Sequence, residues 1–270
     1  MGLGTQGKEV WDRWSKVGES VRLARPAREQ RLIELPAKPD DLIVDLAMSA
    51  FIIVDMQNDF LHPDGWFAKV RGADVAPLME PLGSINTLSD AFRRAAVPVI
   101  HVNWGVRPDA ANLPANVVDK ASECGRQIGY ADEMDHGPVL AARSWGSQSV
   151  QQVRIETADY QVFKHRLSGF RDNELDQLLR RLGVSTIFYA GVNLDRCVFA
   201  TLMDGCFQGY DAILVEDACA TASPEPMATS IIKLIHMLYG FTASSADIVA
   251  AAGAPNLSPS LTSKPKEGAL

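Results

Sequence analysis

Hydrophobic residues along the chain fall into two kinds of stretch, short continuous runs and longer segments at helical spacing. The continuous runs predict buried strands at residues 49–54, 97–103, 159–163, 184–190 and 211–216, with a short edge strand at 241–242. Apolar residues three and four positions apart predict helices at 75–95, 173–182, about 198–207 and 224–239, with a last short helix after Ser244. This alternation predicts an α/β fold, with three α-β-α layers around a doubly wound, mainly parallel sheet of about six strands.

Three segments lack the alternation. Residues 1–47 form an N-terminal extension with Trp11, Trp14 and several arginines, and we expect it either to pack on its own subunit or a neighbour or to be disordered. Residues 104–160 are interrupted by Pro and Gly, which indicates a lid or binding loop containing short helices. Residues 253–270 carry Pro, Ser and Thr and predict a disordered tail. Residues 48–252 are expected to form one domain.

Composition narrows the class of protein. Hydrophobic residues make up 47% of the chain and charged residues 22%, as in ordinary globular proteins. The formal net charge of −7 disfavours a nucleic-acid partner, and no apolar run has the length of a membrane span. Four cysteines lie scattered and no signal-peptide core is present, so we expect reduced thiols in the cytoplasm. No Cys/His cluster suggests a zinc site, and we expect neither metal nor cofactor.

The predicted strand at 184–190 leads through a turn at Gly191 into a helix that starts close to Cys197. Asp195 is a candidate cap for that helix. A cysteine in the first helical turn lies near free backbone N–H groups and the positive end of the helix dipole, which favour the thiolate. Cys197 is therefore a candidate nucleophile. Buried structural cysteines are also common, so both interpretations stay open at this point.

Two further polar residues follow predicted strands. Asp55 comes directly after the strand at 49–54, and Lys164 after the strand at 159–163. The carboxyl ends of parallel strands meet at one edge of the sheet, so both residues are expected near Cys197. A carboxylate can accept the thiol proton, and an ammonium group lowers the pKa of a thiol. Taken singly, Asp55 could be a cap or turn residue, and Lys164 alone is most often a solvated charge.

The chain resembles the isochorismatase-like cysteine hydrolases in three blocks: residues 53–60 (IVDMQNDF), residues 164–170 (KHRLSGF), and Gly191-Val192 ahead of Cys197. The resemblance implies a catalytic triad of Cys197 as nucleophile, Asp55 as general base and Lys164 as electrostatic partner. It also implies a cis peptide bond between Val192 and Asn193. The backbone N–H groups of Asn193 and Cys197 would then stabilise the oxyanion. The implied reaction is hydrolysis of an amide or ureide C–N bond through a thioester.

The sequence departs from the family pattern at Asn193 and Leu194, where many relatives carry a small residue and Thr. We expect this difference to alter the substrate pocket more than the catalytic mechanism. Metal-binding nicotinamidases carry two histidines after their second strand, which residues 101–109 lack, so that type is not expected. His101 is expected in the core instead. The candidates for substrate contact are Gln57, Phe60, Asn103 and Trp104.

The block at residues 164–170 and the lead-in at residues 35–39 (LPAKP) look most like ureidoacrylate amidohydrolases and biuret hydrolases, which implies a small carbamoyl or ureido substrate. Arg107 or Arg166 is a candidate for binding a substrate carboxylate, and each is also typical of a surface ion pair. Cys206 and Cys219 are expected in the core. A homo-oligomer, dimer or tetramer, is expected. Two alternatives stay open: a vinyl-ether hydrolase of the isochorismatase type, which does not need the cysteine, and a non-catalytic binding protein that keeps the fold.

Overall fold

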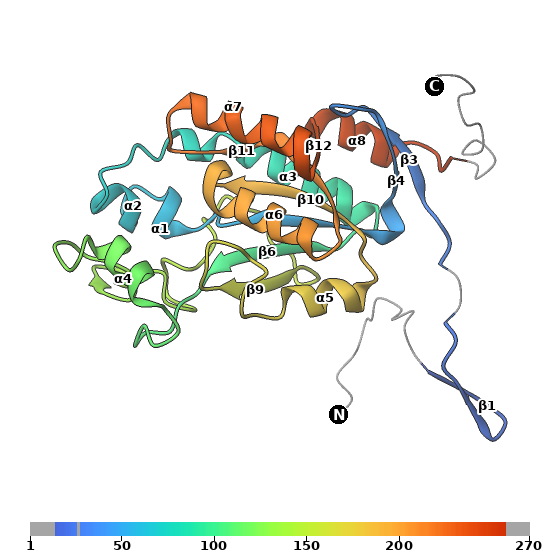
Figure 1. Ribbon diagram of the computed structural model, residues 1–270, viewed down its shortest axis with the longest axis horizontal. Coiled ribbons are helices and arrows are strands. Elements are labelled where there is room, and N and C mark those ends of the chain that lie inside the picture. Colours follow the sequence, from blue (N-terminus) through green and yellow to red (C-terminus); the bar gives the residue numbers. More distant parts are fainter. Residues whose placement is uncertain (1–13, 26–27, 258–270) are drawn as a thin grey trace.

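The computed structural model describes residues 14–25 and 28–257, and its centre is a single six-stranded sheet (Figure 1). Every neighbouring pair of strands in this sheet is parallel. The strands, in their order across the sheet, are β12 (Gly240–Ala243), β11 (Asp211–Ala220), β10 (Thr186–Val192), β5 (Ser49–Val54), β6 (Val99–Trp104) and β9 (Tyr160–Lys164). The predicted doubly wound, parallel α/β sheet is confirmed.

Helices cover both faces of the sheet, as neighbouring residues of β10 show. Phe188 contacts Phe92 of α3, with ring centroids 4.9 Å apart. The next residue, Tyr189, lies against Gly205 of α6, so closely that a Cβ there would overlap the tyrosine hydroxyl. Successive strand residues point to opposite faces, so α3 and α6 lie on opposite sides of the sheet. Helix α8 packs beside α3, and α7 leads into a π-helical turn that contacts α6.

The described residues form α-helices of four to thirteen residues. They are α1 (Asn58–Leu61), α2 (Trp66–Lys69), α3 (Leu82–Arg94), α4 (Ala115–Ser122), α5 (Leu175–Leu182), α6 (Phe199–Phe207), α7 (Glu225–Leu234) and α8 (Ser245–Gly253). The expected start of α3 at residue 75 was wrong, because Pro77 opens a separate 3-10 turn and Pro81 occupies the N-cap position. Short 3-10 helices span Leu46–Met48 and Pro77–Met79, and π-helical turns span Leu194–Val198 and Ile235–Tyr239.

The N-terminal extension divides into two hairpins. Strands β1 (Ser15–Val17) and β2 (Ser20–Arg22) are exposed and project from the body (Figure 1), and Trp14 is 68% exposed. Strands β3 (Leu32–Leu35) and β4 (Leu42–Asp45) form the second hairpin, and its side chains Ile33, Leu35 and Val44 join the main core. Packing, one of the two expected outcomes, therefore holds for this second hairpin. Trp11 lies outside the described residues.

The start of the predicted C-terminal tail is held in place. The Asn256 side chain accepts a hydrogen bond of 2.7 Å from the Leu32 N–H, and the Leu257 N–H donates to the Leu32 carbonyl at 3.0 Å. Residues 254–257 are therefore ordered against the second hairpin, contrary to expectation. The rest of the predicted tail, residues 258–270, lies outside the described residues. Within the part of the chain that the structure describes, no helix is both long enough and apolar enough to span a membrane.

The irregular segment at 104–160 contains α4 and two short strands, β7 (Glu133–Met134) and β8 (Gly137–Pro138). Polar residues just after β5 attach the end of this segment to the sheet. Gln57 donates to the carbonyl of Ser147 at 2.9 Å, and Asn58 donates to the carbonyl of Trp145 at 2.8 Å. The Asp59 carboxylate accepts from the Leu140 N–H at 2.7 Å. The segment is thereby closed over the carboxyl end of β5, beside Asp55.

Candidate active site

Three polar side chains that are far apart in the sequence meet at the carboxyl edge of the sheet. Asp55 follows β5, Lys164 is the last residue of β9, and Cys197 lies in the π-helical turn after β10. The Nζ of Lys164 is 3.0 Å from Oδ2 of Asp55, and both side chains are at most 1% exposed. Lys164 also donates to the Arg166 carbonyl at 3.1 Å. The structure thus brings together the three residues that the sequence singled out.

Burial decides the protonation of the cysteine. It raises the pKa of Cys197 to about 12; Lys164 opposes this rise, and the nearby negative charge of Asp55 adds to it. Burial also raises the pKa of Asp55 above its ordinary value, against the attraction of Lys164. The expected thiolate at a helix start was therefore wrong for the resting site. The thiol keeps its proton and faces a base that can take it.

The expected helix cap was also wrong. Asp195 lies inside the π-helical turn and accepts hydrogen bonds from the hydroxyls of Thr221 and Ser223, the latter at 2.8 Å. The Asn193 side-chain oxygen accepts from the Ala222 N–H at 2.9 Å. These bonds attach the turn that carries Cys197 to the loop after β11. The peptide bond between Val192 and Asn193 is cis, as the resemblance implied.

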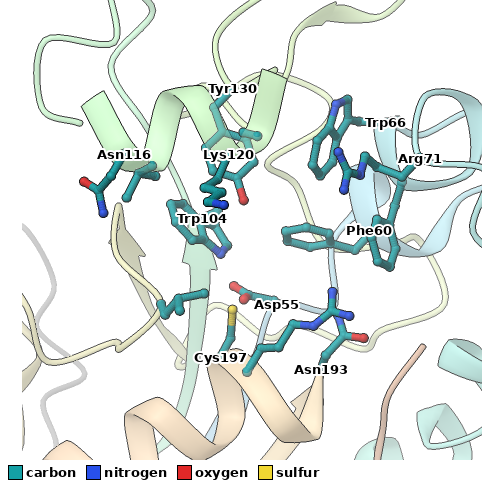
Figure 2. A pocket seen from close by; sticks show the side chains of 15 residues that line it. Asp55, Phe60, Trp66, Arg71, Trp104, Asn116, Lys120, Tyr130, Asn193 and Cys197 are labelled. Atoms are coloured by element: carbon teal, nitrogen blue, oxygen red, sulfur yellow. The ribbon is translucent and has the colours of Figure 1, made fainter. Parts of the chain in front are cut away.

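A cavity of about 350 Å³ opens above Cys197 and Asp55 (Figure 2). Two of the expected substrate contacts, Phe60 and Trp104, line it, as does Asn193. The Trp104 side chain also lies close enough to Cys197 to oppose the rise in the thiol pKa. The cavity is therefore the place where a reacting carbonyl can meet the sulfur.

The other two expected contacts lie elsewhere. Gln57 is fully buried, donates to the carbonyls of Trp104 and Ser147, and accepts from the Trp104 N–H at 2.7 Å. Its amide therefore holds a pocket wall and does not line the cavity. Asn103 donates to the Ser149 hydroxyl at 3.1 Å and lines a separate cavity on the other side of β6.

The two candidate arginines are engaged outside the cavity. Arg107 is exposed and forms an ion pair of 2.7 Å with Asp109. Arg166 lies 3.2 Å from Asp172 and donates to the carbonyl of Asn112 at 2.7 Å. Neither lines the cavity. Both therefore form ion pairs, the alternative that was left open.

Several lining residues escaped the sequence analysis. They come from α2 and the loop behind it, from the irregular segment, and from the turn beside the nucleophile: Trp66, Phe67, Arg71, Lys120, Tyr130 and Arg196. Most of them lie in stretches without hydrophobic periodicity, so spacing carried no signal. Arg196 directly precedes Cys197 in the sequence, and this position alone could have indicated that it lies beside the nucleophile.

His101 and the other metal-ligating residue types bear on whether the site holds a metal ion. His101 is 1% exposed within β6, and its Nε2 is 3.4 Å from Oδ2 of Asp159. Its expected place in the core is confirmed. Among residues 14–25 and 28–257, no group of three His, Cys, Asp or Glu side chains is arranged to hold a metal ion. The absence of a metal from the active protein stays a prediction.

Comparison with known proteins identifies the family. A family model described as the isochorismatase domain matches residues 49–246. The chain belongs to the isochorismatase domain family. Ureidoacrylate amidohydrolase RutB of Azorhizobium caulinodans is 31% identical over 215 residues, which cover 79% of this chain and 94% of that protein. The resemblance stated from the motifs is thereby confirmed.

Solved structures of the isochorismatase family agree with the fold. A cysteine hydrolase from Pseudomonas syringae pv. phaseolicola matches 83% of this chain and 98% of its own, with a TM-score of 0.66 and 22% identity. N-carbamoylsarcosine amidase from Thermoplasma acidophilum matches 73% of this chain and 96% of its own, with a TM-score of 0.55 and 28% identity. The sheet with its flanking helices is thus the architecture of this isochorismatase-family protein.

Proposed function

We propose that this isochorismatase-family protein is a cysteine-dependent amidohydrolase that cleaves a C–N bond of a small amide, carbamoyl or ureido substrate. The observation that carries the proposal is the buried ion pair of Asp55 and Lys164 beside Cys197, at the base of the cavity. A buried pair of charges next to a thiol is costly to maintain for stability alone. It is well suited to moving one proton away from a nucleophile and back.

The proposed reaction has two halves. The Asp55 carboxylate takes the proton of Cys197 as the sulfur bonds to the substrate carbonyl carbon, and the ammonium group of Lys164 stabilises the thiolate as it develops. The C–N bond then breaks and the leaving nitrogen receives that proton from Asp55. In the second half water attacks the thioester, Asp55 takes a proton from the water, and the proton returns to the departing sulfur. The enzyme ends as it began.

We further propose that the backbone N–H groups of Asn193 and Cys197 donate to the carbonyl oxygen as it becomes negative. Both residues line the cavity. Backbone donors do not depend on the side chain, so this role is compatible with the unusual Asn193 and Leu194. The Asn193 side chain instead bonds to the loop after β11.

A carbamoyl or ureido substrate is supported by the relatives. Those at about 30% identity bear the name ureidoacrylate amidohydrolase, and a structural relative bears the name N-carbamoylsarcosine amidase. Both names pair amide hydrolysis with a compound that carries a ureido or carbamoyl group. We propose the same bond type here, with ammonia and carbon dioxide as the products of the carbamoyl half.

The test is a panel of ureides and simple amides, with ammonia release measured for the wild type and for Cys197→Ser. We expect ureide turnover by the wild type, loss of more than about 1,000-fold in the variant, and an acylated Cys197 peptide in acid-quenched samples. Turnover of simple amides without any ureide turnover would contradict the substrate class. Full ureide turnover by Cys197→Ser would contradict the mechanism. Turnover of a vinyl ether by that variant would point to isochorismatase chemistry instead.

The proposed setting is the cytoplasm, in a homo-oligomer that does not bind nucleic acid. The four cysteines are unpaired thiols, as a reducing compartment requires. Helix α7 buries none of its residues, and Met237 and Leu238 just beyond it are 73% and 65% exposed. An apolar surface of this kind is typical of a subunit interface. Sedimentation of the purified protein as a monomer would contradict the oligomer.

A further inference from the structure

The indole of Trp104, the last residue of β6, lies beside the groups that react. Trp104 is 1% exposed and lines the same cavity as Cys197 and Asp55. Figure 2 shows its indole nitrogen on the edge of the ring that faces Asp55 and Cys197. The closeness of this side chain to the sulfur opposes the rise in the thiol pKa. Trp104 is therefore placed to act on the sulfur as well as to form a wall.

The indole N–H of Trp104 is buried and has no hydrogen-bond partner among the residues that the structure describes. A buried tryptophan N–H normally finds an acceptor, because leaving it unpaired is costly. Trp66, which lines the same cavity, follows the usual pattern, and its indole N–H donates to the carbonyl of Ile128 at 2.8 Å. The N–H of Trp104 therefore lacks an acceptor in the resting site.

Three contacts fix the direction of this N–H. The side-chain amide of Gln57 donates to the Trp104 carbonyl at 2.9 Å and accepts from the Trp104 backbone N–H at 2.7 Å. The Nζ of Lys164 lies 4.1 Å from the centre of the indole ring, and the centre of the Tyr130 ring lies 5.0 Å from it. Turning the indole away would break these contacts, so the donor is held in a fixed orientation before the reaction starts.

Burial limits which groups can accept from the indole nitrogen, because a substrate in the cavity does not reach a buried atom. The groups that remain are the two that exchange a proton, the Asp55 carboxylate and the Cys197 sulfur. Neither carboxylate oxygen of Asp55 accepts from the indole in the resting site, where the negative charge faces Lys164 at 3.0 Å. When Asp55 takes the proton, the charge moves to the sulfur, and a thiolate is a much stronger acceptor than a thiol.

We propose that the indole N–H of Trp104 donates a hydrogen bond to the Cys197 sulfur as the thiol gives its proton to Asp55; this inference rests on the proposed cysteine mechanism. The bond forms together with the charge and is absent from the resting site, so it lowers the barrier to attack. The same bond stabilises the sulfur when it leaves the carbonyl carbon after water has attacked the thioester. The indole keeps its proton throughout. Trp104 is thus a catalytic residue as well as part of the cavity wall.

The experiment alkylates Cys197 with iodoacetamide from pH 7 to 9 in the wild type and three variants. Trp104→Phe removes the N–H, and replacing Trp104 by benzothienylalanine removes it while keeping the shape of the bicyclic ring. Trp145→Phe is the control, since Trp145 lies outside the cavity and contacts His62. Alkylation of the exposed Cys124, followed by peptide mass spectrometry in the same samples, supplies the reference rate.

We expect Cys197 in both Trp104 variants to react about three- to tenfold more slowly than in the wild type at every pH, relative to Cys124. Loss of a hydrogen bond to a charged group raises the thiol pKa and lowers the thiolate fraction, and the greater nucleophilicity of a more basic thiolate offsets part of this effect. The smaller Phe side chain leaves more room for the reagent, so a slower rate would not come from crowding. The control should match the wild type.

Turnover gives an independent readout. For a ureide that the wild type hydrolyses, kcat of the benzothienylalanine variant should fall at least about tenfold while KM stays within about twofold, because the N–H acts on the sulfur and not on substrate binding. Wild-type alkylation rates in both Trp104 variants would overturn the inference and leave the cysteine mechanism standing. Full turnover by Cys197→Ser would overturn both.

Discussion

Replacing Lys164 by Met tests the electrostatic core of the site. The Lys164 Nζ and the Asp55 Oδ2 are 3.0 Å apart and excluded from solvent, which at an effective dielectric constant near 20 corresponds to an attraction of about 5.5 kcal/mol. Removing one partner of a buried pair typically costs about 3–5 kcal/mol, because the remaining group must either stay charged without compensation or change its protonation state. We expect Lys164→Met to lower the free energy of unfolding by about that amount at pH 7.5.

The sign of the pH dependence makes the test specific. Without Lys164, burial raises the pKa of Asp55 further above 3.8, so the variant folds with this carboxyl protonated. The stability that the protonated Asp55 contributes to the variant is present at low pH. It is lost as the pH rises toward the new folded-state pKa of Asp55. The deficit relative to wild type should therefore grow with pH, by at most about 1.4 kcal/mol per unit, between the folded-state pKa of Asp55 in the wild type and its higher value in the variant.

The assay is urea unfolding followed by circular dichroism at pH 5.5 and pH 7.5. Lys69→Met is the matched control, since Lys69 also lies 3.0 Å from an aspartate, Asp64, but both side chains are about half exposed. We expect little change there. The double variant Asp55→Asn, Lys164→Met should recover most of the lost stability. A deficit in Lys164→Met that is absent, or equal at the two pH values, would refute the assignment of Asp55 and Lys164 as a coupled buried pair.

Three further outcomes follow from the same geometry. Alkylation of Cys197 by iodoacetamide should accelerate about tenfold per pH unit from pH 7 to 9 without a plateau, because burial raises the thiol pKa to about 12; a plateau near pH 7 would indicate a preformed thiolate. Gly146→Ala should destabilise the fold by about 2 kcal/mol in thermal unfolding, since its Cβ would overlap the Asp59 carboxylate that holds the irregular segment; an unchanged melting temperature would contradict this. Gly83→Ala, in open space on α3, should stabilise by about 0.5–1 kcal/mol in the same measurement, and a loss there would contradict the helix assignment.

Much of the fold was determined by local pattern. Residues 49–54 and 184–190 are continuous apolar runs, and a segment of that kind is stable only as a strand covered on both faces. The parallel sheet then brings the carboxyl ends of its strands to one edge, so Asp55 and Lys164 could be placed near Cys197 before any contact was known. The helix start expected at residue 75 failed because Pro77 and Pro81 acted locally against the hydrophobic period.

Tertiary structure decided the chemistry around that edge. The pKa of Cys197 depends on how much solvent and charge surround it, and these come from chain segments distant in sequence, so the helix-start argument gave the wrong direction. Arg71 lies in a stretch without hydrophobic period, and its place beside the cavity rests on long-range contacts. Gln57 was predicted to touch substrate, but its amide bonds to the backbone of a neighbouring strand. The sequence by itself therefore determined the sheet and which polar residues meet at its edge. Only packing decided their protonation and which side chains a substrate meets, because both depend on groups that no local pattern brings together.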